Sequence, residues 1–317
     1  MKKLVNKHSV MFRIWRTFFT AAIVAALFVL LLFVNLLQLS AFILIKPFSL
    51  RLFVEINRFF AINYWYLYVI WLEKLYGCEI VFSGDRLPVG ENVIFMLNHQ
   101  NIADAPLLIS LAWRKRRLGD LKFFVKNVVK WLPGPGWGLY FLGTLYVKRD
   151  WLKDKEYIKR TFQRIIDHNL PFWLVSFLEG TRITRQKLAR SQEYARKKGL
   201  KILNHLLIPR TKGFVASVNA LRGKIDAVYD GTIIYPDGVP YLWQFMMGIV
   251  PRVHFHVKRY PISEIPRIDS EIASWVMKRF EEKDQMLSDF YCRDILPSPI
   301  VHNPLTISPD MFLGIKY

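Results

Sequence analysis

The stretch that decides the fold is Phe95–Leu108, FMLNHQNIADAPLL. One apolar run ends at Leu97, two residues before His99, and a second begins after Asp104, so the pattern predicts a buried strand, a loop and a helix. On one continuous helix the two side chains would point about 140° apart and could not meet. If Asp104 instead lies in the first turn of the second element, its carboxylate can hold the imidazole for general-base chemistry. Taken alone, a capping histidine beside a surface aspartate is the more common explanation.

Outward from this stretch, strand-like runs alternate with helical ones. The near-continuous apolar run 172–180, FWLVSFLEG, is typical of a strand buried on both faces. Helical spacing occurs in 153–168, and a last helix is expected from about Ser270 to Phe290. Strands that alternate with helices predict an α/β domain. Further strands are expected at about 78–85, 91–99, 225–236 and 252–260.

The N-terminal part predicts a membrane-embedded helix. From Phe18 to Ile45 no residue is charged, whereas about 20 apolar residues are enough to cross a bilayer. Both flanks are basic, so a single span and a re-entrant hairpin both remain open. The shorter stretch Phe59–Leu72, FFAINYWYLYVIWL, fits either an interfacial segment or a core helix of the following domain.

Charge points to an anionic partner. The 317-residue chain has 45 Lys and Arg against 25 Asp and Glu, a formal charge of +20, and 52% of its residues are hydrophobic. Nucleic acid, anionic lipid headgroups and phosphorylated substrates all fit such an excess. No nucleic-acid motif accompanies the basic stretches at 183–201 and 210–213, so a solvated or headgroup-facing helix explains them better.

No metal site is predicted. Cys78 and Cys292 have neither metal-ligand nor disulfide spacing. His254 and His256 share one face of an expected strand, but the sequence offers no evident third ligand. We interpret both histidines as structural.

Three more loops place candidate binding groups after apolar runs. In FLEGTR, residues 177–182, Gly180 allows a ligand to approach the backbone closely, and the planar guanidinium of Arg182 can bind a phosphate through two hydrogen bonds. Another apolar run is followed by basic residues and ends at Arg149. LLIPRTKG, residues 206–213, combines a proline with two basic side chains. In open α/β sheets ligands bind beyond the carboxyl ends of strands. Taken alone, FLEGTR is about equally well a strand-end turn with a solvated arginine, and a solvated terminus is the favoured explanation for the run that ends in Arg149. For LLIPRTKG the alternative is a plain proline-initiated turn.

Taken together and in this order, these blocks resemble the glycerolipid acyltransferases, the 1-acyl-sn-glycerol-3-phosphate acyltransferase and lysophospholipid acyltransferase family. The family's Asn-His, four residues, Asp pattern is similar to residues 98–104, and its Glu-Gly-Thr-Arg block to 179–182. Its basic strand block is similar to 143–149, and its proline block to 208–209. The resemblance covers about residues 82–266. One departure is Ala103, where the family pattern often has an aromatic residue.

The resemblance implies a mixed sheet flanked by helices, preceded by the membrane-embedded helix. It divides the chain into an N-terminal membrane-associated helical region at 1–76, an acyltransferase domain at 77–292 and a C-terminal tail at 293–317. His99 would deprotonate the acceptor hydroxyl, and Asp104 would orient His99. The residues implied in substrate binding are Lys126, Arg149, Glu179, Gly180, Thr181, Arg182 and Pro209.

The same resemblance implies the reaction partners. The donor would be acyl-CoA as co-substrate, or acyl carrier protein, with no other cofactor, and the acceptor a lysophospholipid such as lysophosphatidic acid. The enzyme would be integral to a phospholipid membrane, in the endoplasmic reticulum of a eukaryote or the inner membrane of a bacterium, and would not act on nucleic acid. A catalytically inactive lipid-binding protein on the same fold, and a basic membrane adaptor, are the alternatives.

Overall fold

A seven-stranded mixed sheet forms the centre of the protein, in the order β1-β7-β6-β2-β5-β3-β4. The computed structural model describes residues 10–148, 150–293 and 295. Strands β2 to β6 run parallel, β7 is antiparallel to β6, and β1 is parallel to β7. The predicted α/β fold with a mixed sheet is therefore confirmed. The strands are β1 (Glu79–Gly84), β2 (Val93–Leu97), β3 (Leu121–Lys126), β4 (Leu145–Val147), β5 (Trp173–Phe177), β6 (Ala227–Ile234) and β7 (Arg252–Pro261).

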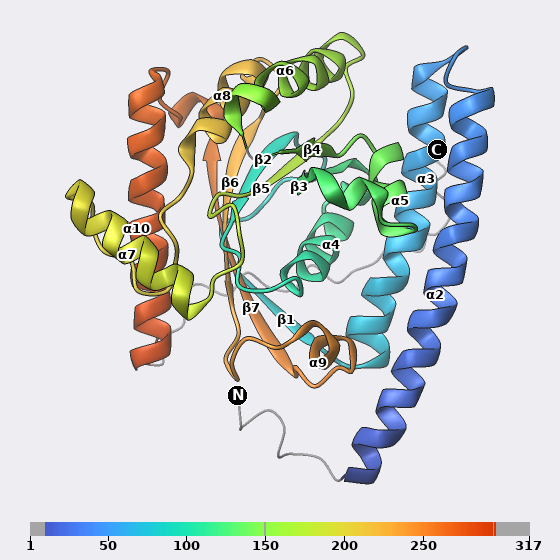
Figure 1. Ribbon diagram of the computed structural model, residues 1–317, viewed down its shortest axis with the longest axis horizontal. Coiled ribbons are helices and arrows are strands. Elements are labelled where there is room, and N and C mark those ends of the chain that lie inside the picture. The colour runs from blue at the N-terminus through green and yellow to red at the C-terminus, as the bar shows by residue number, and fades with distance from the viewer. Residues whose placement is uncertain (1–9, 149, 294, 296–317) are drawn as a thin grey trace.

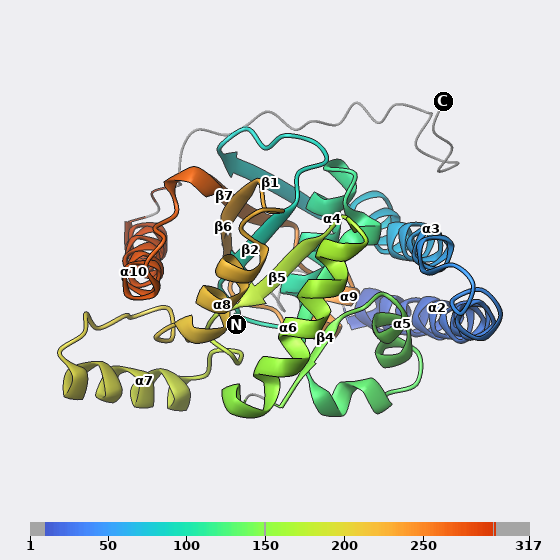
Figure 2. The ribbon, with the colours of Figure 1, turned by 90° about the horizontal axis from the view of Figure 1, so that it is seen from above.

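Helices cover both faces of this sheet (Figure 2). One face packs against α3, η1, α4 and α9, and the other against α6, α8 and α10. The α-helices are α2 (Val10–Leu44), α3 (Leu50–Val69), α4 (Asp104–Arg114), α5 (Pro135–Phe141), α6 (Trp151–Asp167), α7 (Arg185–Lys198), α8 (Thr211–Leu221), α9 (Leu242–Met246) and α10 (Asp269–Arg293). Shorter helical turns are η1 (Ile70–Leu75), η2 (Leu118–Asp120), η3 (Asn127–Trp131) and η4 (Ile262–Glu264).

Strand β2 explains why an uninterrupted apolar run is needed at the centre of this sheet. Phe95 and its neighbours at alternate positions pack into the core beneath α4, while Ile94 and Met96 pack into the core beneath α6 and α8. All five residues of the strand are fully buried. A strand with a helical layer on each face has no solvent side, so its sequence does not alternate between apolar and polar residues.

Helices α2 and α3 stand side by side along one side of the α/β domain (Figure 1). Met11–Leu44, within α2, is the one helix in the described part of the chain that is long and apolar enough to cross a membrane. Helix α3 continues into η1, and buried side chains on both, including Val69 and Leu72, belong to the core that α4 and the sheet share. The stretch Phe59–Leu72 is thus a core helix of the domain, the second of the two readings left open by the sequence.

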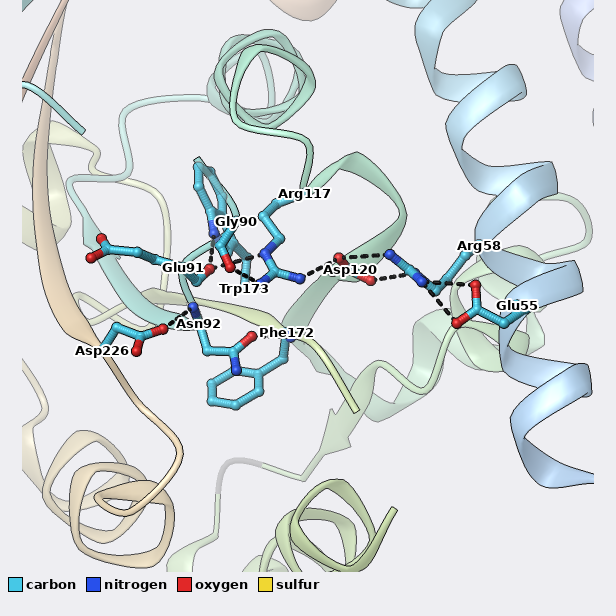
Figure 3. A network of polar contacts seen from close by, with 10 residues as sticks. All are labelled: Glu55, Arg58, Gly90, Glu91, Asn92, Arg117, Asp120, Phe172, Trp173 and Asp226. Atoms are coloured by element: carbon cyan, nitrogen blue, oxygen red, sulfur yellow. Dashed lines mark hydrogen bonds and ion pairs between the residues drawn. The ribbon is translucent and has the colours of Figure 1, made fainter. Parts of the chain in front are cut away.

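A polar network fastens α3 to the end of the sheet where β2 and β5 begin (Figure 3). Buried Asp120 lies between Arg58 of α3, at 2.6 Å, and Arg117, at 3.0 Å. Arg117 also donates to the carbonyl of Glu91 at 3.0 Å, and Arg58 reaches Glu55 at 2.8 Å. The network holds α3 to the α/β domain through charge as well as packing.

Candidate functional site

His99 and Asp104 meet at the carboxyl end of the central strands. His99 follows β2 by two residues, and Asp104 is the first residue of α4. His99 Nδ1 lies 3.0 Å from Asp104 Oδ2. The contact expected from the strand–loop–helix pattern is therefore present, and it leaves the second ring nitrogen, Nε2, for a reacting group.

Asp104 is fully buried and held by several donors. Its Oδ2 accepts the backbone N–H groups of Gln100 at 2.8 Å and Asn101 at 2.9 Å, in addition to the His99 ring. Its Oδ1 accepts the Tyr235 hydroxyl at 2.8 Å. A carboxylate with four donors has little freedom to rotate, so it sets both the position and the tautomer of the imidazole.

Tyr235 is a site residue that sequence reasoning missed. It follows β6 directly, is fully buried, and comes from a strand adjacent to β2. Asn98 ties the same two strand ends together, since its Oδ1 accepts the N–H of Ile233 at 2.8 Å and its Nδ2 donates to the Ile233 carbonyl at 3.0 Å. The only signal in the sequence is a tyrosine at the end of a buried strand.

Glu179 holds the histidine loop from the other side. Its Oε1 accepts the backbone N–H of His99 at 2.6 Å and its Oε2 the N–H of Leu207 at 3.1 Å. Burial raises the pKa of Glu179 to about 8, although both amides favour the ionised form. Both oxygens are thus engaged by backbone, so this residue shapes the site through the loops that it joins.

The His99 ring lies between two cavities. It stacks on Phe177, with ring centroids 4.1 Å apart, and His99, Phe124 and Phe177 line both spaces. A polar cavity of about 700 Å³ lies on the side of α7 and α8. An apolar cavity of about 690 Å³ lies between the domain and the α2–α3 pair. An elongated substrate with an apolar chain and a charged end could place its reacting centre at His99.

The polar cavity carries the positive charge expected of a phosphate site. Gly180 has φ +68°, and a Cβ there would lie 3.1 Å from Arg210 Cδ, so the arginine stem packs on the glycine. Pro209, Arg210 and Lys212 all line this cavity with Gly180. The sequence placed both cations in a candidate binding loop, for which a plain proline-initiated turn was the alternative.

The remaining candidates are dispersed. Arg182 is exposed and lines neither cavity, and Thr181 accepts a hydrogen bond from Lys187 Nζ at 2.7 Å. Lys126 lines the apolar cavity instead of the polar one. Arg149 lies outside the described residues.

In the described part of the chain, no group of three His, Cys, Asp or Glu side chains could hold a metal ion. His256, which the sequence placed beside His254, bonds through Nδ1 with Ser83 Oγ at 3.0 Å. Burial lowers the pKa of both histidines. They belong to a buried polar layer beneath α10.

Comparison with known proteins adds an independent line of evidence. Residues 79–236 match the family model described as Acyltransferase, and residues 245–310 the model described as Acyltransferase C-terminus. The chain is 34% identical over 277 residues to probable 1-acyl-sn-glycerol-3-phosphate acyltransferase 5 of Arabidopsis thaliana, a match that covers 87% of this chain and 73% of the relative. It is 36% identical over 273 residues to 1-acyl-sn-glycerol-3-phosphate acyltransferase 2 of Brassica oleracea, covering 84% and 70%.

A second type of relative is lysocardiolipin acyltransferase 1 of Gallus gallus, 34% identical over 224 residues, which are 69% of this chain and 59% of that protein. Among solved structures, the 1-acyl-sn-glycerophosphate acyltransferase PlsC of Thermotoga maritima aligns with 82% of this chain and 96% of its own, at 15% identity and a TM-score of 0.49.

Proposed function

The chain belongs to the 1-acyl-sn-glycerol-3-phosphate acyltransferase and lysophospholipid acyltransferase family and is an O-acyltransferase, and we propose that it transfers a fatty acyl group from acyl-CoA to the free hydroxyl of lysophosphatidic acid or a related lysophospholipid. The observation that carries this proposal is that the His99–Asp104 pair lies where the apolar cavity and the polar cavity meet. An inactive lipid-binding protein would have no need for a carboxylate held by four donors against an imidazole.

His99 and Asp104 supply the proton chemistry. His99 Nε2 accepts the proton of the acceptor hydroxyl while its oxygen attacks the thioester carbonyl carbon. Asp104 stabilises the imidazolium that forms, as the acid does in a Ser-His-Asp triad. When the tetrahedral intermediate collapses, the C–S bond breaks and the imidazolium returns its proton to the CoA thiolate. Because the substrate hydroxyl is the nucleophile, the protein contributes no covalent intermediate.

Each of the two cavities binds a different part of the substrates in this proposal. The apolar cavity takes a fatty acyl chain, because its lining offers mainly Leu, Val and aromatic side chains. Arg210 and Lys212 in the polar cavity take phosphate, which a guanidinium holds with two parallel hydrogen bonds. Arg149, Arg182 and Lys126 stay candidates for a second phosphate contact. No cofactor beyond the acyl-CoA co-substrate, and no nucleic acid, is part of this proposal.

The membrane is the proposed site of action. Helix α2 exposes most of its apolar surface, which suits a bilayer better than water. We assign the protein to the integral membrane fraction, in the endoplasmic reticulum of a eukaryote or the inner membrane of a bacterium. The predicted division at residues 76 and 292 also stays a proposal.

An assay of thiol release tests the reaction. Purified protein in detergent micelles is given oleoyl-CoA or oleoyl acyl carrier protein with lysophosphatidic acid, lysophosphatidylcholine or a lysocardiolipin. We expect thiol release from oleoyl-CoA that depends on lysophosphatidic acid and yields phosphatidic acid. Binding of lysophosphatidic acid without thiol release from either donor would favour the inactive lipid-binding alternative.

A further inference from the structure

A buried carboxylate on α10 holds the loop that connects α7 to α8, residues 199–210. Asp284 Oδ1 accepts the backbone N–H groups of Asn204 at 3.0 Å and of His205 at 2.7 Å, and Asp284 Oδ2 lies 2.9 Å from the Asn204 nitrogen. Asp284 is only 6% exposed. A buried carboxylate is costly unless donors compensate it, so these charge-assisted bonds fix the loop firmly to α10.

Helix α10 is itself fixed to the central sheet. Lys283, the residue before Asp284, is almost fully buried, and its Nζ donates to the carbonyl of Gly231 and to Asp230 Oδ1, both at 2.6 Å. Gly231 and Asp230 belong to β6, which pairs with β2. Consecutive residues of α10 therefore contact the sheet and the α7–α8 loop. The helix lies in the segment that matches the Acyltransferase C-terminus model.

The α7–α8 loop is also bound to the backbone of the catalytic histidine. The N–H of Leu207 donates to Glu179 Oε2 at 3.1 Å, and Glu179 Oε1 accepts the N–H of His99 at 2.6 Å. Leu206, between His205 and Leu207, is buried in the core, so this part of the loop is held by packing as well. A shift of the loop at His205 is therefore passed to the backbone of His99 through one carboxylate.

The same loop carries part of the polar cavity. The N–H of Ile208 donates to Ser191 Oγ of α7 at 2.9 Å, and the N–H of Arg210 donates to the carbonyl of Leu178, just after β5, at 2.8 Å. Arg210 lines the polar cavity and is proposed above to bind phosphate. The position of the loop therefore sets where this guanidinium begins.

We propose that Asp284 is a positioning residue for acyl transfer. From α10 it fixes the α7–α8 loop, and through that loop it sets the backbone of His99, by way of Glu179, and the placement of Arg210. Asp284 lines neither cavity, so its effect on substrates is transmitted by the loop alone. The effect on acyl transfer rests on the proposed function, whereas the order of the loop and of the backbone at His99 does not.

Hydrogen exchange tests the positioning without any substrate. In full-length protein in detergent micelles, Asp284→Ala should speed amide exchange in residues 204–208 and 98–101 about tenfold, because bonds to a buried charged carboxylate are lost. Asp284→Asn keeps one acceptor oxygen, so its rates should lie between those of Asp284→Ala and the wild type. Strand β3, which does not pair with β6, should exchange at the wild-type rate in both variants.

Asp289→Ala is the matched control on the same helix. Its carboxylate accepts from Gln285 at 2.9 Å and lies 3.5 Å from Arg293 Nη1, both within α10, so exchange in the two loops should not change. Faster exchange at 204–208 with none at 98–101 would overturn the proposal, as would equally faster exchange in β3. If Asp284→Ala does not fold, Asp284→Asn supplies the same comparison.

A double-mutant cycle tests the path to the reaction. Asp284→Asn should lower kcat/KM for lysophosphatidic acid about tenfold, and adding Glu179→Gln should cost less than the product of the two single losses, because both break one connection. The losses from Asp284→Asn and Tyr235→Phe should multiply, since Tyr235 reaches Asp104 from β6. Multiplying losses in both pairs would show that Asp284 does not act through Glu179. If the wild type turns over no lysophospholipid, the proposed function fails, while hydrogen exchange still decides whether Asp284 positions His99.

Discussion

At the scale of single residues, contacts between residues close in the sequence were easier to predict than contacts between distant residues. A contact between His99 and Asp104 was possible from the spacing, because a strand–loop–helix junction lets these two side chains meet, and the order of the other blocks favoured it over a capping histidine. Tyr235 could not be predicted in this way, since it reaches Asp104 from 131 positions away. Glu179 was identified, but sequence alone does not reveal that its oxygens face two backbone amides.

Tyr235→Phe should lower kcat about tenfold and leave both KM values unchanged. The hydroxyl hydrogen-bonds a buried charged carboxylate, and such bonds contribute roughly 1.5–3 kcal/mol, part of which supports the imidazolium in the transition state. Tyr229→Phe is the matched control, since Tyr229 is also buried but donates to Glu91. Steady-state kinetics of both variants makes the comparison. A changed KM with an unchanged kcat would mean that Tyr235 contacts substrate.

Arg210→Ala should raise the KM for lysophosphatidic acid about tenfold or more, because a charge-assisted contact to phosphate is lost. Arg182→Ala should have the smaller effect, since Arg182 lines neither cavity. Varying each substrate in turn separates acceptor from donor. An Arg210→Ala defect confined to acyl-CoA would assign the polar cavity to the phosphates of the donor.

Glu179 should make stability depend on pH. Burial raises the pKa of Glu179 in the folded protein to about 8, above its usual value of 4.5, so between those values the native state holds a proton that the unfolded chain has released. The free energy of unfolding should therefore fall as pH rises through this window, by at most about 1.4 kcal/mol per pH unit. Glu179→Gln should remove this contribution. The free energies of unfolding of the wild type and of Glu179→Gln, measured in detergent at pH 5.5 and 8, test this prediction. An equal change with pH in the two proteins would contradict it.

At the scale of elements, the buried strands were the most predictable part. The runs at 91–99 and 172–180 contain β2 and β5, because a strand covered on both faces must be apolar throughout. Other assignments depended on tertiary packing. The composition of residues 131–137, WLPGPGW, is typical of a loop, but Gly134 adopts φ +81° and Pro135 begins α5, since proline is well suited to a first helical position. The role of Phe59–Leu72 depended on α4, which sequence does not place beside it.

Asp120→Asn should lower the free energy of unfolding by about 2 kcal/mol. It leaves Arg58 and Arg117 without their shared buried anion, and the loss is moderated because both arginines are partly solvated. Glu55→Gln is the control within the same network, because Glu55 is 53% exposed and should contribute less than about 0.5 kcal/mol. Urea unfolding compares them. Equal losses in the two variants would show that the network is held by solvated charges alone.

At the scale of the whole molecule, the sequence predicted an apolar helix and an anionic partner, and the structure shows where the helix and the candidate cations lie relative to His99. Helix α2 walls the apolar cavity, and the cations at 210 and 212 line the polar one. Neither cavity could be predicted from the sequence, because the residues that line the two cavities, from α2, the loop after β2 and α8, meet only after folding. The proposed acyl transfer therefore centres on His99, which lines both cavities.

The most direct test is the turnover number of His99→Ala measured beside its affinity for lysophosphatidic acid. With the general base removed, kcat should fall by about 10²–10⁴-fold, while lysolipid affinity, membrane association and thermal stability stay near those of the wild type. His168→Ala, which changes an exposed histidine at the end of α6, should behave as the wild type. A His99→Ala protein that keeps near-normal kcat would contradict the assignment of this site as the acyl-transfer centre.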